Sequence, residues 1–202
     1  MILSQNPTDN NPIELKGFFY KYVPYTLHLP NSKAAANLKI ETTNIRLTSF
    51  DYYDSSNLNL RFNIQEHDFA CLSVFDTIAR KGVKLSIKAK DLPLKVNYFA
   101  DNKEYSTGST IYKSDIVVDG FFTCTVINFD ADIRFKIKKF NLIFISDGEY
   151  HSYLSESSAL TIEQKNALKK LKQKTIIVVD NIIVIGHNNE QIKAEPVVFY
   201  LN

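Results

Sequence analysis

The sequence contains no tryptophan and few glycines, prolines or cysteines: six glycines, six prolines and two cysteines in 202 residues. The six glycines are isolated from one another. A phosphate-binding loop needs several glycines close together so that the backbone can approach the anion, and its P-loop form also needs a lysine. The sequence therefore argues against nucleotide chemistry of that type.

Short-range metal-ligand motifs are missing as well. The two cysteines, Cys71 and Cys124, form no Cys-x-x-Cys pair. The four histidines are far apart in the sequence, at His28, His67, His151 and His187. Zinc sites usually show their ligands at short spacings. We therefore expect surface or loop positions for the histidines and two free, largely buried thiols for the cysteines.

Long apolar runs and a strong charge of one sign are also missing. No stretch approaches 18 consecutive apolar residues, so the sequence predicts no membrane-spanning helix. The net charge is +2 with both signs interspersed, which is too weak and too mixed to indicate nucleic-acid binding. Residues 1–12 show neither a basic n-region nor an apolar h-region, which taken literally predicts a cytoplasmic protein.

What the sequence does contain is β structure. Eleven tyrosines and fourteen phenylalanines accompany many β-branched residues, a composition that favours strands. Apolar and polar residues alternate at 57–64 and 83–89, and the β-branched run at 176–179 predicts a buried strand. Short strands at regular spacing are typical of β-sandwiches. We predict a mainly β chain with a disordered lead-in at 1–14, an Ig-like β-sandwich domain at 15–92, and a second one at 93–202 carrying one short α-helix at about 161–172.

The clearest local signals lie in the second half. Apolar and polar residues alternate over 128–137, as in a strand with one face in a core. Thr161 followed by Gln164 is a capping box, which begins a helix. Leu168 and Leu171 fall at helical spacing and should pack on the sheet. Between strand and helix we expect a long polar loop.

The segment 18–29 allows two interpretations. It is rich in aromatic residues, namely Phe18, Phe19, Tyr20, Tyr22 and Tyr25. Pro24 and Pro30 favour an edge strand because proline cannot donate a hydrogen bond to a sheet. The aromatic side chains either pack the first sandwich or form a partner-binding edge.

Three oxygen-bearing side chains, Asn128, Asp130 and Asp132, share one face of the predicted strand. Such a set can hold a hard cation or act as a carboxylate pair. The same face continues to Arg134 and Lys136, which favours a solvated, salt-bridged surface instead.

His67 and Asp68 lie close to Cys71 and resemble a nucleophile dyad only superficially. Residues so close together on a strand do not generally meet, so we expect no such dyad.

The order and spacing of these pieces resemble the C-terminal domain of GldM/PorM, a periplasmic motor-associated protein of Bacteroidota gliding motility and type IX secretion. The resemblance is carried by the segments 111–115, 128–140, 160–172 and 179–182, followed by Gly186, Asn189, Pro196 and a terminal strand. Residues 90–99 resemble the linker entering that domain, and residues 20–87 resemble the β-rich domain before it. The chain departs from the family at Gln173 and Lys174, where Arg-Gly is usual, and at Asn181, which is usually acidic.

This resemblance implies a non-catalytic protein–protein interaction module. It implies a homodimer in the periplasm that contacts outer-membrane-associated secretion or gliding components and needs no cofactor. Proton-driven motion in that family belongs to a membrane helix and a motor partner, so we expect no motor role for this chain alone. The candidate partner-binding residues are Lys165, Lys169, Lys172, Tyr20 and Tyr22, although a lysine-rich helix face is often only solvated.

Two other function classes stay open. One is a carbohydrate- or small-ligand-binding sandwich that uses Tyr52, Tyr53 or Tyr105 as a platform. The other is a metal-dependent hydrolase built on Asp130 and Asp132.

Overall fold

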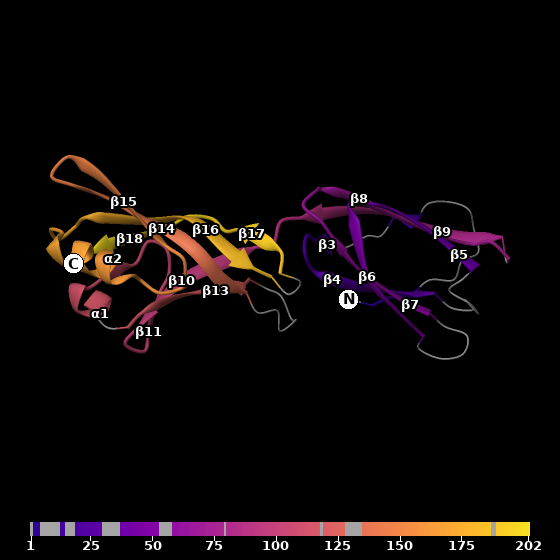
Figure 1. The fold of residues 1–202 in the computed structure, drawn as a ribbon, viewed down its shortest axis with the longest axis horizontal. Coiled ribbons are helices and arrows are strands. Elements are labelled where there is room, and N and C mark those ends of the chain that lie inside the picture. Colours follow the sequence, from indigo (N-terminus) through magenta and orange to yellow (C-terminus); the bar gives the residue numbers. More distant parts are fainter. Residues whose placement is uncertain are drawn as a thin grey trace. The chain divides into compact units, whose positions relative to one another are not determined.

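The computed structural model describes residues 2–4, 13–14, 19–29, 37–52, 58–78, 80–117, 119–127, 135–186 and 189–202. The chain divides into two compact units, residues 1–92 and residues 93–202 (Figure 1). Each unit is described by itself.

The first unit is a β-sandwich. Its strands are β1 (Ile2–Ser4), β2 (Ile13–Glu14), β3 (Phe19–Tyr20), β4 (Pro24–Leu29), β5 (Leu38–Thr43), β6 (Ile45–Tyr52), β7 (Leu58–Ile64), β8 (Phe69–Asp76) and β9 (Lys81–Lys90). One sheet has the order β1-β4-β7-β6 and the other the order β2-β9-β8-β5, with β3 also paired to β9. The alternating residues of β7, β8 and β9 point into the core, and Leu60, Leu72 and Leu85 are fully buried.

Aromatic side chains join the two sheets of this unit. The ring of Tyr25 on β4 lies 5.2 Å from Phe19 on β3 and 5.8 Å from Phe62 on β7. Phe19 and Tyr25 are both buried. For these two residues, the interpretation that the aromatics pack the first sandwich is therefore confirmed.

Two expectations for the first unit are wrong. Strand β4 is not an edge strand, because it lies between β1 and β7. Pro24 is tolerated there because it is the first residue of the strand. The lead-in is also not wholly irregular, since β1 pairs in parallel with β4 and β2 pairs in parallel with β9.

The second unit also has two sheets, with two helices among its described residues. Its elements are β10 (Leu94–Ala100), β11 (Lys103–Tyr105), β12 (Thr110–Ile111), α1 (Lys113–Val117), β13 (Phe121–Val126), β14 (Lys136–Ser146), β15 (Glu149–Ser155), α2 (Ile162–Lys170), β16 (Ile176–Ile185), β17 (Gln191–Lys193) and β18 (Val197–Leu201). The small sheet has the order β11-β10-β13. The large sheet has the order β12-β18-β16-β14-β15, with β17 beside β16.

A cluster of aromatic rings fills the space between the two sheets. Phe122 of the small sheet lies 4.7 Å from Phe140 of the large sheet and 5.0 Å from Tyr98, measured between ring centroids. Tyr98 also contacts Phe199 of β18. Gly120 leaves room for this packing, because a Cβ atom there would lie 2.2 Å from the Tyr98 hydroxyl oxygen.

The expected long polar loop before the helix is instead a β-hairpin. Strands β14 and β15 pair from Phe140 opposite Ser155 to Ser146 opposite Glu149. Asp147 and Gly148 form the turn with φ values of 52° and 84°, the conformation that a two-residue Asp-Gly hairpin turn requires. The predicted strand at 128–137 overlaps only the start of β14, and residues 128–134 lie outside the described part of the chain.

The predicted helix is present as α2, and the structure adds the short α1, which was not predicted. The capping box forms as expected: Thr161 Oγ1 accepts from the Gln164 backbone at 3.1 Å, and Gln164 Oε1 accepts from the Thr161 backbone at 2.9 Å. Leu168 and Leu171 are buried in the core cluster that contains Phe140 and other large-sheet residues.

Replacing Leu168 by alanine should lower the free energy of unfolding by about 2–4 kcal/mol, because Leu168 is 2% exposed and its loss leaves a cavity against the sheet. Urea unfolding followed by circular dichroism measures this change. Lys169→Ala, at an exposed position of the same helix, is the matched control and should stay within about 0.5 kcal/mol. A Leu168→Ala effect as small as the control would show that the helix packs differently.

Candidate functional site

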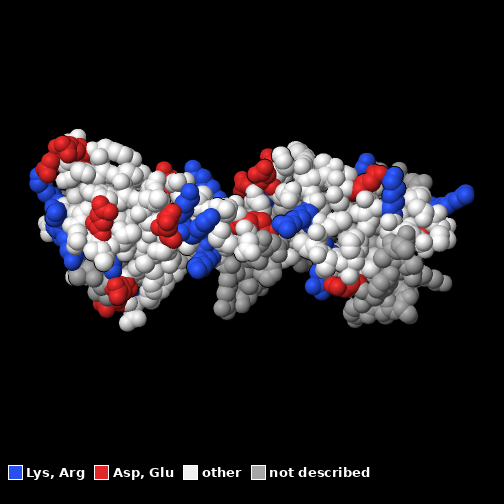
Figure 2. All heavy atoms as spheres, viewed as in Figure 1, with Lys and Arg blue, Asp and Glu red and all other residues white. Residues whose placement is uncertain are grey.

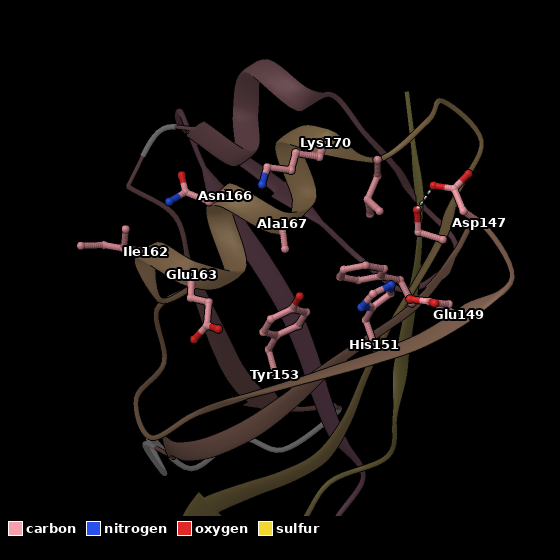
Figure 3. A pocket seen from close by; sticks show the side chains of 12 residues that line it. Asp147, Glu149, His151, Tyr153, Ile162, Glu163, Asn166, Ala167 and Lys170 are labelled. Carbon is pink, nitrogen blue, oxygen red and sulfur yellow. Dashed lines mark hydrogen bonds between the residues drawn. The ribbon is translucent and has the colours of Figure 1, made fainter.

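A groove lies between helix α2 and the β14–β15 hairpin. Its volume is about 840 Å³, and its lining includes Phe144, His151, Tyr153, Glu163 and Lys170. Figure 3 shows the His151 and Tyr153 side chains projecting from β15 toward the helix. The groove has this floor because alternate residues of β15 point to one face of the sheet.

The floor of the groove is a row of nearly parallel rings. The rings of His151 and Tyr153 differ in plane by 12°, with their centroids 6.4 Å apart. The buried Phe144 ring lies 5.2 Å from His151 and 5.8 Å from Tyr153. His151 and Tyr153 remain partly exposed, so part of each ring is accessible to a ligand in the groove.

Gln164 holds the helix over this floor. Its side chain is fully buried, and its Nε2 atom donates to the backbone carbonyl of Tyr153 at 2.9 Å. The Gln164 side-chain amide therefore accepts a hydrogen bond from the backbone at the helix N-terminus and donates one to β15.

Charged groups surround the groove. Glu149 and Glu163 lie on its strand and helix sides, and Lys170 extends along the helix. At the hairpin turn, Asp147 pairs with Lys172 at 2.6 Å, and the hydrogen bond from Lys172 lowers the pKa of Asp147. Acidic and basic side chains are interspersed on the face of the molecule seen in Figure 2, and neither sign dominates it.

The three lysines proposed as partner contacts lie in different surroundings. Lys165 pairs with Asp119 at 2.8 Å and is 18% exposed, whereas Lys169 is exposed one turn further along α2. Lys172 lies beyond the helix, which ends at Lys170. Only Lys165 and Lys169 therefore share a helical face, and Lys169 is the more accessible of the two.

Tyr20 and Tyr22, the other proposed contacts, are half-buried. The Tyr20 backbone N–H donates to the Tyr25 hydroxyl at 2.7 Å. Tyr22 has a φ of 63°, and its backbone N–H donates to the carbonyl of Ile64 at 2.7 Å. These bonds fix the backbone at both positions.

Lys21, between these tyrosines, is buried and makes two ion pairs. Its Nζ atom lies 2.8 Å from carboxylate oxygens of both Asp68 and Asp91. The hydrogen bonds with Asp68 and Asp91 raise the pKa of Lys21. Asp68 therefore serves an ion pair, which fits the expectation that it forms no dyad with His67 and Cys71.

The other candidate metal-binding and ligand-binding residues from the sequence fall into two groups, those outside the described residues and those within them. Asn128, Asp130, Asp132, Tyr53 and His187 lie outside the described residues, and so does the side chain of Tyr52. Among the residues that the structure describes, no three His, Cys, Asp or Glu side chains are grouped to hold a metal ion. His67 is exposed, whereas His28 and His151 are only partly exposed.

Both cysteines are free, as predicted. Cys124 is buried, and burial raises the pKa of its thiol to about 12. Cys71 is only partly buried.

The family model of the GldM C-terminal domain matches residues 94–202, more than half of the chain. The chain belongs to this family. The match covers the second unit almost completely, including the groove, both helices and the large sheet. Membership in this family suggests a component of the gliding-motility or type IX secretion machinery.

Lys174 follows the helix with a backbone conformation unusual for a non-glycine residue. It adopts a φ of 66°, a conformation that glycine reaches without steric cost. Its backbone N–H donates to the carbonyl of Leu201 at 2.6 Å. The chain thus keeps the backbone geometry that a glycine would favour.

In the described part of the chain, no helix is long and apolar enough to cross a membrane.

Likenesses to solved structures are weak. The endo-fucoidan hydrolase MfFcnA4 of glycoside hydrolase family 107 is 10% identical with a TM-score of 0.33, over 95% of this chain and 28% of that one. The Yersinia pseudotuberculosis adhesin InvE is 10% identical with a TM-score of 0.27, over 100% of this chain and 56% of that one. The C-terminal domain of the Streptococcus agalactiae polypeptide BspA is 11% identical with a TM-score of 0.22, over 88% and 84%.

Likeness at these TM-scores says nothing about what the chain binds or does. The chain spans well under two thirds of the first two structures. No match is found among curated proteins.

Among the described residues of the GldM-like unit, Asp115 on α1 is the buried carboxylate. It accepts hydrogen bonds from the hydroxyl of Tyr105 and from Ser114, and Lys103 Nζ lies 3.5 Å away. The Tyr105 hydrogen bond is the largest influence and lowers the pKa of Asp115. Tyr105 is itself buried and has a pKa raised to about 12, chiefly by burial. It is therefore unsuited to be the exposed platform for a sugar that the sequence suggested.

Asp115 should make the free energy of unfolding of this unit depend on pH. Because its pKa is lowered in the folded state, its stabilisation is present above the unfolded pKa of about 3.9 and is lost as pH falls through the folded value. Asp115→Asn should lower the free energy of unfolding by about 1 kcal/mol at pH 7, and this difference should vanish toward pH 2. Urea unfolding at a series of pH values measures it.

The control is Asp119→Asn, which removes a fully exposed carboxylate that pairs with Lys165. We expect no measurable change for it at either pH. A pH-independent effect of Asp115→Asn would contradict the assigned role of the Asp115 charge.

Proposed function

We propose that this chain is a non-catalytic protein-interaction module of a GldM-like gliding or type IX secretion component. It works in the periplasm as a homodimer and contacts outer-membrane-associated partners without a cofactor. The observation that carries this proposal is the match of the GldM C-terminal domain model to residues 94–202. Within that region the groove and the adjoining lysine face of α2 supply accessible contact groups.

Lys169 is the side chain on this face best suited to an acidic partner. Lys165 and Lys172 already pair with Asp119 and Asp147, whereas Lys169 extends from the exposed side of the helix. An exposed cation at the rim of an interface mainly guides association and selects partners of complementary charge.

Reversing this charge should therefore impair partner capture. We expect Lys169→Glu to reduce capture of secretion or gliding proteins from a periplasmic and outer-membrane extract by at least about fivefold, because it places like charges opposite each other. Crosslinking followed by quantitative mass spectrometry measures the captured amounts.

The matched control is Lys95→Glu, a charge reversal at an exposed position of β10 in the same unit. It should leave capture unchanged. Wild-type capture of no secretion or gliding protein would contradict the proposed function, and equal losses for both variants would contradict the assignment of the α2 face.

The aromatic row of the groove favours a second candidate function, binding of a carbohydrate. Sugar rings present apolar C–H faces that can lie on aromatic rings. Carboxylates accept hydrogen bonds from sugar hydroxyl groups, and amides can both accept and donate them. The groove offers Tyr153 and His151 as the platform, with Glu149, Glu163 and Asn166 beside them.

Tyr153→Ala should then abolish glycan binding or weaken it by about tenfold or more, because it removes the platform. A glycan array followed by titration calorimetry measures the affinity. Tyr150→Ala is the matched control, since Tyr150 lies on the opposite face of the same strand and should leave affinity unchanged. A wild-type chain that binds no glycan, or equal affinity of the Tyr153 variant, would eliminate this candidate.

A further inference from the structure

One end of the outer face of the large sheet is largely apolar, although it faces away from the core. Strand pairing places Tyr150 of β15 opposite Ile145 of β14, and Ile176 of β16 opposite Tyr200 of β18. These four side chains are 66%, 65%, 52% and 44% exposed in that order. They form one end of an apolar surface that crosses four strands.

A second row continues this surface. Ile143 pairs with Val178, and Val178 pairs with Val198, so these three side chains share the same outer face. All three are partly exposed, and Leu154, further along β15, is 52% exposed. We call the surface formed by both rows and Leu154 the apolar sheet face.

Polar groups border the apolar sheet face. Asn141, opposite both Leu154 and Asp180, begins the polar margin on one side. On the other side the hairpin turn carries the Asp147–Lys172 ion pair. An apolar centre with a polar margin is the arrangement of a protein–protein interface.

Its area matches the requirement of a dimer. An exposed fraction of about one half to two thirds leaves each large side chain on the order of 100 Å² in water. Tyr150, Ile145, Leu154, Ile176 and Tyr200 then supply on the order of 500 Å² per copy, at the upper end of what a monomer exposes. Two copies together bury on the order of 1,000 Å², about the minimum for a specific interface, before the second row is added.

We propose that the apolar sheet face is buried against the same face of a second copy of this chain. The inference rests on the homodimer in the proposed function and assigns its interface. Neither row contains a charged residue, so two identical faces can meet around a two-fold axis without opposing like charges. Two such sheets pack face to face in the same way as the sheets of a β-sandwich.

The test is self-association of the whole chain, measured by sedimentation velocity over a range of concentrations. Wild-type protein should form a dimer of twice the 23.1 kDa chain mass. Ile145→Glu and Tyr200→Glu, on different strands, should each weaken dimerisation at least about tenfold, because each buries a charge within the apolar sheet face.

Ile162→Glu is the matched control. Ile162 is a 79% exposed isoleucine on α2, so the variant makes the same chemical change away from the apolar sheet face and should leave dimerisation unchanged. Thermal melts monitored by circular dichroism verify that each variant is folded.

A wild-type chain that stays monomeric at about 100 μM would overturn the inference, as would a dimer that both folded sheet variants leave intact. Dimer formation is measured on the purified chain alone. A monomer would also contradict the homodimer of the proposed function, whereas a dimer that both folded sheet variants leave intact would contradict only the assigned face. Partner capture is a separate measurement and can succeed or fail with either result.

Discussion

The second unit depends on strand β14, which pairs along both of its edges. It pairs with β15 from Phe140 to Ser146 on one side and with β16 from Lys136 to Phe144 on the other, so its second half is hydrogen-bonded within the sheet along both edges. Because side chains alternate along a strand, every second side chain of β14 points into the core and the others point to the outer face of the sheet. Phe140, Leu142 and Phe144 pack inward, and the residues between them lie on the outer face.

The same alternation explains why a groove exists beside α2. The helix has nine residues, which is about 14 Å of length, and Gln164 anchors it at Tyr153. Leu168 and Leu171 pack into the core, whereas Ala167 and Lys170 line the groove. His151 and Tyr153, which line the groove from β15, stay partly exposed.

Sequence patterns predicted the elements whose signals are local. Residues close together in the sequence are enough to recognise the capping box of Thr161 and Gln164, and the same is true of the alternation in 57–64. The hairpin was missed although Asp147-Gly148 is a strong turn signal, because β14 is apolar on both faces and hides its alternation. The environment of Tyr105 could not be predicted either, since its burial depends on Asp115 and on packing between distant strands. The groove could not be predicted either, because it forms only where α2 packs beside β15, and short sequence patterns do not predict that packing.

The composition of β16 links the sequence to the apolar sheet face. The run of β-branched residues at 176–179 predicted a buried strand. The structure buries Ile177 and Val179 in the core but leaves Ile176 52% exposed and Val178 partly exposed on the outer face. A sheet with one face in water is normally polar on that face, because exposed β-branched residues promote association. Both the sequence of β16 and the exposed area therefore indicate a large sheet whose outer face is covered when the chain is assembled.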